Sequence, residues 1–347
     1  MEQALKRALV LVVASTLSAC GSGGSTKRVA MPEAGSIVYP PAPAAAVIEW
    51  LGAVSVRSDV ARGGASWKKV LVGEVEAEPA LAAPTAVAIG PDRVLYVVDQ
   101  QLRGVVIIDR ENGRFDLFRG SSPGSLVEPV GVAVADDGTL YVSDAASQAV
   151  YAYDGELRFT AAFGGSEVFG RPTSLAVSSD GRLAVCDTRL HSVHVVDTAT
   201  GEVAYAHGGT EHGRAEGEFN FPVAAAFDAE GYLYVSDYLN FRIQVFDPRG
   251  DLDLVFGMAG DRPGDLNRPR GLAADSAHGV LYEVDGAFQV VQMFNLEGEL
   301  LMWFGEPGPG PGQFSLPTGI ALRDDLLVVS DTLNRRVQLF RFLGPPS

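Results

Sequence analysis

Cysteine and histidine are both scarce in this sequence. The 347 residues include two cysteines, Cys20 and Cys186. Cys20 lies in an N-terminal segment for which we infer a different role, so Cys186 has no partner for a disulfide. No pair of the five histidines has the spacing of a known metal motif. The sequence therefore predicts no disulfide framework, no bound metal and no other cofactor. The histidines are His191, His194, His207, His212 and His278.

Positive charge is also in short supply. Lys and Arg total 27 against 43 Asp and Glu, which gives a formal net charge of −16 at pH 7. No block of basic residues interrupts this acidity. An acidic protein repels the phosphate backbone, so the composition argues against nucleic acid as a partner.

The N-terminus carries an apolar run that is too short to cross a bilayer. Lys6 and Arg7 precede the apolar residues 8–16, as in a signal peptide. The next four residues, Leu17-Ser18-Ala19-Cys20, resemble the lipobox of bacterial lipoproteins. The resemblance implies that residues 1–19 are removed and that the Cys20 sulfur carries a diacylglyceryl group, which would make the membrane a partner. The alternative is an ordinary secretory signal with a chance cysteine.

Residues 20–46 have the composition of a tether. Glycine and serine fill positions 21–25, and prolines stiffen positions 40–43. Gly21, rather than Asp, follows the cysteine, and by resemblance to Gram-negative lipoproteins this favours the outer membrane. We therefore expect an exported, lipid-anchored protein on the periplasmic side of the outer membrane rather than at the inner membrane.

The rest of the chain repeats itself six times. Each unit opens with a proline and a short run of small apolar residues, and the prolines recur every 43 to 50 residues. A Gly or Asp turn follows, then a second strand ending in Asp, a third strand, a glycine turn and a fourth strand. A period of this length is typical of β-propeller blades. The prolines are Pro84, Pro129, Pro172, Pro222, Pro269 and Pro317.

Residues 84–342 resemble the NHL-repeat family. The pattern Asp-x-x-Asn-x-Arg-[Ile/Val]-Gln-[Val/Leu]-Phe occurs at 237–246 and at 331–340, and the other four repeats depart from it at the Asn and Arg positions. The resemblance implies an all-β fold, a six-bladed β-propeller with four antiparallel strands in each blade. NHL propellers serve as sensor domains and recognition modules, so the resemblance also implies a binding role.

The last repeat lacks its own fourth strand. After residues 336–342 only a short segment with two prolines remains, whereas the apolar residues 47–52 have no repeat of their own. We predict that 47–52 pair antiparallel with 336–342 and close the ring, because an open ring would expose a strand edge. The folded domain then spans 47–347 and includes an insertion at 53–83. Within that insertion, Trp67 either covers one mouth of the channel or packs on the outside of a blade.

Candidate catalytic groups all have a simpler structural interpretation. Cys186 takes a position that serine holds in three other repeats, and we expect a small buried residue. The innermost strands hold chiefly Ala, Val, Gly, Leu and Ile, and we find neither a Ser-His-Asp set nor a phosphate loop. We therefore predict that the protein has no catalytic residues and is not an enzyme; the alternative is a metal-dependent propeller hydrolase or lyase of a small molecule. The six aspartates that we expect to cap turns are Asp99, Asp144, Asp187, Asp237, Asp285 and Asp331.

The loops between the second and third strands are the expected recognition surface. Loops on a rigid scaffold often carry binding residues, and Tyr, Phe and Arg are favoured at interfaces. We expect this loop face, rather than the channel wall, to bind a protein, a peptide or a small ligand. The candidate residues are Arg189, Tyr238, Phe241, Phe288 and Arg335, with Trp67 as a further one.

Overall fold

The computed structural model describes residues 37–40, 46–60 and 78–344. The signal peptide, Cys20 and Trp67 lie outside the described residues, as does most of the segment that we expect to be a tether. No helix within the described ranges is both long and apolar enough to span a membrane.

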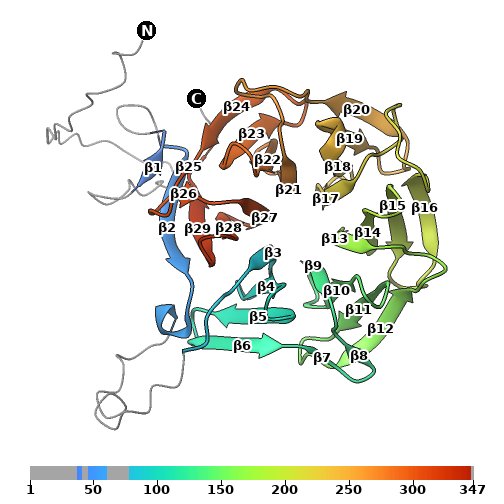
Figure 1. Ribbon diagram of the computed structural model, residues 1–347, viewed down its shortest axis with the longest axis horizontal. Coiled ribbons are helices and arrows are strands. Elements are labelled where there is room, and N and C mark those ends of the chain that lie inside the picture. Colours follow the sequence, from blue (N-terminus) through green and yellow to red (C-terminus); the bar gives the residue numbers. More distant parts are fainter. Residues whose placement is uncertain (1–36, 41–45, 61–77, 345–347) are drawn as a thin grey trace, which may run out of the picture. The chain divides into compact units, whose positions relative to one another are not determined.

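The described residues form a six-bladed β-propeller, with each blade a sheet of antiparallel strands arranged around a central opening (Figure 1). Each innermost strand lies beside the innermost strand of the next blade, and β27 lies beside β3, so the ring is closed. The all-β, six-bladed fold that the repeats predict is therefore confirmed.

The strands follow the repeats in order. Blade one comprises β3 (Pro84–Ile89), β4 (Leu95–Asp99), β5 (Gly104–Asp109) and β6 (Arg114–Phe118), and blade two comprises β9 (Pro129–Val134), β10 (Leu140–Asp144), β11 (Ala149–Tyr153) and β12 (Phe159–Gly164). Blade three comprises β13 (Pro172–Val177), β14 (Arg182–Asp187), β15 (Ser192–Asp197) and β16 (Val203–Gly208), and blade four comprises β17 (Pro222–Phe227), β18 (Leu233–Asp237), β19 (Arg242–Phe246) and β20 (Leu252–Phe256). Blade five comprises β21 (Pro269–Asp275), β22 (Val280–Asp285), β23 (Val290–Asn295) and β24 (Leu300–Phe304).

Blade six combines both ends of the folded chain. It comprises β27 (Pro317–Arg323), β28 (Leu326–Asp331), β29 (Arg336–Phe342), β2 (Ile48–Val54) and β1 (Val38–Tyr39). Short elements complete the chain: the hairpin of β7 (Gly120–Ser121) and β8 (Gly124–Ser125), the pair β25 (Glu306–Pro307) and β26 (Gln313–Phe314), and the 3-10 helices η1 (Arg57–Asp59) and η2 (Tyr238–Asn240).

Burial explains why the sequences of the second and third strands are nearly continuous runs of apolar residues. Neighbouring blades pack face to face, so both faces of these strands lie against protein, and all five residues of β10 are buried. The fourth strands lie at the outer edge, and β12 accordingly alternates between more and less exposed residues. Glycine in the left-handed region closes the tight turns, as at Gly138 and Gly231 with φ of 87° and 88°.

The ring closes as the sequence predicts. Strand β2 pairs antiparallel with β29, and the register places Ile48 opposite Phe342 and Val54 opposite Val337. Strand β1, which falls within the segment 20–46, extends this sheet by one more strand. Its Tyr39 hydroxyl donates to the Gly312 carbonyl at 3.1 Å, so the ordered sheet begins before residue 47.

The six repeat aspartates cap turns. Asp99 Oδ2 accepts the backbone N–H groups of Ala82 (2.6 Å) and Ala83 (3.0 Å), and Oδ1 accepts that of Leu102 at 3.0 Å. Each carboxylate thus joins the loop before an innermost strand to the loop after the second strand. All six carboxylates are fully buried, and Asp144, Asp187 and Asp285 accept equivalent backbone bonds. Asp237 and Asp331 each accept one backbone N–H from the preceding loop and, from the loop after the second strand, the side-chain amide of Asn240 or Asn334.

Blades four and six add a buried ion pair to this cap. Arg242 Nε donates to Asp237 Oδ2 at 2.8 Å, and Arg336 Nε donates to Asp331 Oδ2 at 2.7 Å. Both guanidinium groups also donate to backbone carbonyls of the preceding loop. These are the two blades whose sequence carries the full Asn-x-Arg-x-Gln pattern. The motif therefore binds the long loop before the innermost strand to its blade.

Candidate functional site

Each innermost strand has an irregular start. The pairing with the second strand skips one or two residues directly after the repeat proline, as between Pro84 and Ala86 and between Pro269 and Leu272. A skipped residue is released from the ladder, which turns its side chain in a new direction. The first skipped residues form what we call the mouth layer: Thr85, Val130, Thr173, Val223, Arg270 and Thr318.

The six mouth-layer residues line the rim of a cavity of about 340 Å³, here called the channel cavity. Three consecutive residues from each innermost strand line it, so its wall is built by all six blades. Below the mouth layer lies a layer of small residues and then an apolar layer. The small layer is Ala86, Gly131, Ser174, Ala224, Gly271 and Gly319, and the apolar layer is Val87, Val132, Leu175, Ala225, Leu272 and Ile320.

Arg270 is the only charged member of the mouth layer, since the five equivalent residues are Thr or Val. Its guanidinium carbon lies 5.5 Å from the centroid of the Tyr238 ring, a cation–π distance. Gly286 leaves the room for this side chain, because a Cβ there would lie 3.0 Å from Arg270 Nε. Blade five thus combines an arginine in the mouth layer with a glycine in the adjoining loop.

Three polar atoms around the channel cavity have no hydrogen-bond partner among the described residues. They are the Nε of Arg270 and the Oγ1 atoms of Thr85 and Thr188, and all three are shielded from solvent. The three residues belong to blades five, one and three. Because all three atoms are shielded from solvent, they lie inside the cavity wall and do not face its open space; the Nη1 and Nη2 atoms of Arg270 are not among these shielded, unpaired atoms.

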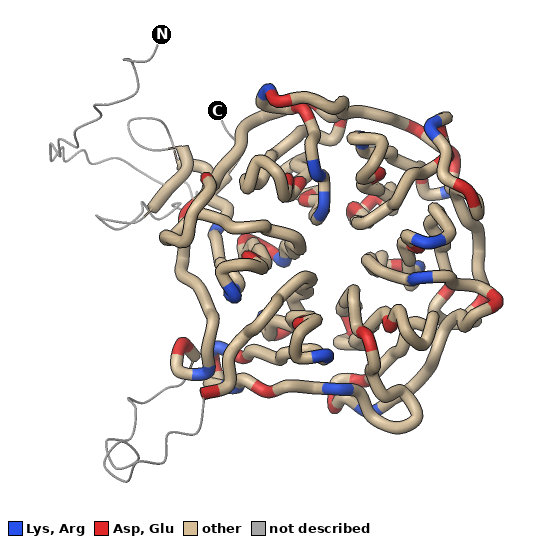
Figure 2. The backbone as a smooth tube through the Cα atoms, in the orientation of Figure 1, with Lys and Arg blue, Asp and Glu red and all other residues tan. Residues whose placement is uncertain are grey.

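Charge is distributed unevenly between the two ends of the channel. The loops after the second strands, here called the inner loops, carry Arg103, Arg189 and Arg335 and, apart from the capping aspartates, no Asp or Glu; basic segments accordingly lie around the central opening (Figure 2). The turns at the opposite end are acidic. They carry Asp92, Asp136, Asp137, Asp180, Glu230, Asp324 and Asp325. The loops that precede the innermost strands lie at the same end as the inner loops and add carboxylates, including Glu128, Glu218 and Asp265, so the excess of positive charge is confined to the inner loops.

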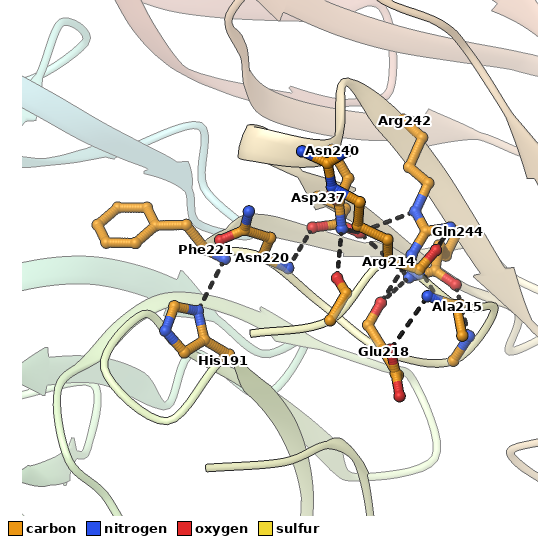
Figure 3. A network of polar contacts seen from close by, with 12 residues as sticks. His191, Arg214, Ala215, Glu218, Asn220, Phe221, Asp237, Asn240, Arg242 and Gln244 are labelled. Carbon is orange, nitrogen blue, oxygen red and sulfur yellow. Dashed lines mark hydrogen bonds and ion pairs between the residues drawn. The ribbon is translucent and has the colours of Figure 1, made fainter. Parts of the chain in front are cut away.

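Two further residues define the rim. Arg171 forms an ion pair with Glu128 at 2.7 Å, so a carboxylate of the protein already neutralises its charge. Phe221 adopts a φ of 70° and is 39% exposed, and its N–H donates to His191 Nδ1 at 3.1 Å. Figure 3 shows His191 beneath this bond and the Phe221 ring turned away from the Asp237 network. The rim therefore carries an exposed phenylalanine ring, and the backbone N–H of that residue is bonded to a histidine.

None of the candidate residues from the inner loops lines the channel cavity. Tyr238 comes nearest, because it stacks on Arg270 and its ring lies 6.2 Å from that of Phe221. Phe241 packs against the core between blades four and five. Three lie apart from the cavity: Phe288 is half-buried, and Arg189 and Arg335 are exposed. Tyr238 and Phe241 therefore contribute to packing, and the exposed Arg189 and Arg335 lie in the inner loops outside the cavity lining.

The sequence interpretation missed the mouth layer. The innermost strands do hold small and apolar residues in their second and third positions, but Arg270 and three threonines occupy the first. The missed signal was available in the repeats, because aligning the residue after each proline singles out Arg270. What the alignment could not supply is the bulge that points this position into the channel.

Metal-binding geometry is lacking in the described part of the chain: no three His, Cys, Asp or Glu side chains come together there as a candidate ligand set. Cys186 is fully buried, and burial raises the pKa of its thiol. Glu283 is also fully buried, at a position where the other five blades have valine. Burial raises the pKa of Glu283 well above its ordinary value, so this carboxyl is held in its neutral form.

The model of the NHL repeat family matches residues 169–196, which span most of blade three. This chain is therefore a six-bladed β-propeller that contains an NHL repeat. No sequence among curated proteins matches the chain.

Several solved propellers share the fold. A streptogramin B lyase is 13% identical, with a TM-score of 0.57 over 76% of this chain and 94% of its own. A virginiamycin B lyase from Staphylococcus aureus is 13% identical, with a TM-score of 0.53 over 76% of this chain and 84% of its own. A gluconolactonase from Xanthomonas campestris is 18% identical, with a TM-score of 0.56 over 84% of this chain and 98% of its own.

These relatives contradict the prediction that the chain is not an enzyme. The propellers that it resembles are two lyases and a gluconolactonase, so the fold of this chain is one that supports catalysis. Identities of 13% to 18% establish the fold alone and leave the reaction open.

Proposed function

We propose that this propeller binds a small molecule in its channel cavity. The observation that carries the proposal is a cavity walled by all six blades, with one charged side chain in its mouth layer, Arg270, that forms no ion pair with a described carboxylate. A volume of about 340 Å³ suits a small ligand or the end of a larger one. The exposed ring of Phe221 borders the entrance, so the loop face contributes to recognition from the rim.

A variant that fills the entrance tests this proposal. Val223 is a half-buried member of the mouth layer, and Val223→Trp places a large ring across the opening. Val203→Trp is the matched control, since Val203 is 40% exposed on the outer strand β16. We expect the wild type and Val203→Trp to retain the same compounds from a small-molecule extract by equilibrium dialysis and mass spectrometry, and Val223→Trp to lose them. Equal retention by all three proteins contradicts the proposal.

A second candidate function is chemical conversion of the ligand in the same cavity, which the lyase and gluconolactonase folds favour. The groups available there are the guanidinium of Arg270, which can stabilise developing negative charge, and threonine hydroxyls, which can orient a substrate. Incubation of the retained compounds with the wild type and with Val223→Trp distinguishes binding from conversion. A product formed only with the wild type favours an enzyme.

We further propose that the propeller is held at a membrane through Cys20, on the periplasmic side of the outer membrane. The support is the sequence alone: a signal peptide, a lipobox and Gly21 at the next position. In a Gram-negative host, Cys20→Ser should leave the protein unprocessed or soluble, whereas the wild type should fractionate with outer membranes. If Cys20→Ser still yields mature, acylated protein in the membrane fraction, the proposed anchor is wrong.

A further inference from the structure

We infer that the ligand of the channel cavity is an amphiphilic organic anion whose negative group binds Arg270, an inference that rests on the binding role proposed above. The first argument is the charge of the lining. Of the described residues that line the cavity, Arg171 and Arg270 are charged, and none is Asp or Glu. Because Arg171 pairs with Glu128, Arg270 is the charge that is left for a ligand.

The second argument is the state of the Arg270 side chain. It lines the cavity and forms no ion pair with a described carboxylate. Tyr238 stacks on the guanidinium, and the missing side chain of Gly286 makes the room that Arg270 itself occupies. A guanidinium presented in this way binds carboxylate, phosphate or sulfate groups through charge-assisted hydrogen bonds.

The third argument is the layering of the wall. The charged side chains lie at the rim, and Ser174 is the one polar side chain of the small layer. The glycines of the small layer allow neighbouring innermost strands to approach closely, and the apolar layer lines the deeper part. A ligand with its charge at the mouth and an apolar body directed inward satisfies both regions, whereas a wholly polar anion leaves the apolar layer unused.

Octanoate and octan-1-ol are the probes that separate charge from apolar contact. They share a chain length, and only octanoate carries a negative group. Binding of each to the full chain is measured by isothermal titration calorimetry for the wild type, Arg270→Gln and Arg103→Gln. Arg103 is the matched control, because it is an exposed arginine of an inner loop outside the cavity and its loss changes net charge equally.

We expect Arg270→Gln to weaken octanoate about ten-fold or more, as for loss of a charge-assisted hydrogen bond, and to leave octan-1-ol nearly unchanged. Arg103→Gln should alter neither by more than about two-fold, since exposed charges act weakly. Equal weakening by the two variants, or octanol binding as tightly as octanoate in the wild type, overturns the anion inference. So does the absence of octanoate binding.

The Val223→Trp variant distinguishes failure of this inference from failure of the proposed function. If both probes bind the wild type, both are lost in Val223→Trp and Arg270→Gln has no effect, the cavity binds ligands but the anion assignment is wrong. If octanoate binds Val223→Trp as it binds the wild type, the site lies elsewhere and both proposals fail. Melting curves of every variant confirm that the compared proteins are folded.

Discussion

The indole Nε1 of Trp50 donates to Oε1 of Gln338 at 2.9 Å, although the two residues are 288 positions apart. Trp50 lies in β2, and Gln338 is the fully buried glutamine of the NHL pattern in β29. The same oxygen accepts the Gly312 N–H at 3.0 Å. The strand that closes the ring is therefore bonded to the residue that, in blade six, also holds the preceding loop.

Deleting residues 47–54 should destabilise the propeller strongly. The deletion removes the buried side chains of Val47, Ile48 and Val54, each worth about 2 kcal/mol, and exposes β29 as a new edge. We expect a fall of about 5 kcal/mol or more in the unfolding free energy, measured with urea, together with aggregation in light scattering.

Trp50→Phe provides the control for this deletion. The substitution keeps an aromatic side chain in β2 and removes one hydrogen bond, so we expect the unfolding free energy to fall by about 1 kcal/mol without aggregation. A deletion variant with the same urea midpoint as the wild type would show that the pairing of β2 with β29 contributes little.

Loss of Arg336 should be costly because Asp331, its partner at 2.7 Å, is fully buried. Arg336→Met leaves that carboxylate without its counter-charge, and we expect a loss of about 3–5 kcal/mol in the unfolding free energy. Arg158→Met is the comparison, since Arg158 is 71% exposed and its ion pairs lie at the surface. We expect no measurable change in its urea midpoint; if the two variants unfold alike, the buried pair does not fasten the blade.

Glu283 should make the protein less stable as the pH rises. Burial raises the pKa of this carboxyl in the folded state, so above the ordinary pKa of glutamate the unfolded chain releases a proton that the folded protein retains. Stability contributed by Glu283 is therefore highest below that ordinary value and falls as pH increases towards the raised pKa.

Glu283→Gln removes this dependence while keeping the shape of the side chain. Urea unfolding at several values between about pH 4.5 and pH 8 should show that the unfolding free energy of the variant increases relative to that of the wild type as pH rises. Parallel stability curves for the two proteins would mean that Glu283 ionises equally well in the folded and unfolded states.

The ring could be predicted from the sequence because its determinants are local and repeated. The repeat prolines, the glycine turns and the terminal aspartates recur in register, and the pairing of 47–52 with 336–342 followed from counting strands. The channel cavity could not be predicted in the same way, because the direction of Arg270 depends on a bulge and on Gly286 in another loop. The binding role of the aromatic residues in the inner loops stays a prediction, since Tyr238 and Phe241 also make packing contacts that their sequence does not reveal.

The most direct test of the account is a crystal structure of the full chain soaked in 8-bromooctanoate, with the bromine located by its anomalous scattering. We expect a bromine peak on the axis between the six innermost strands, near the apolar layer, and the carboxylate within hydrogen-bond distance of Nη1 or Nη2 of Arg270. A bromine peak outside the channel cavity, or a carboxylate turned away from Arg270 with the chain still in the cavity, would contradict it.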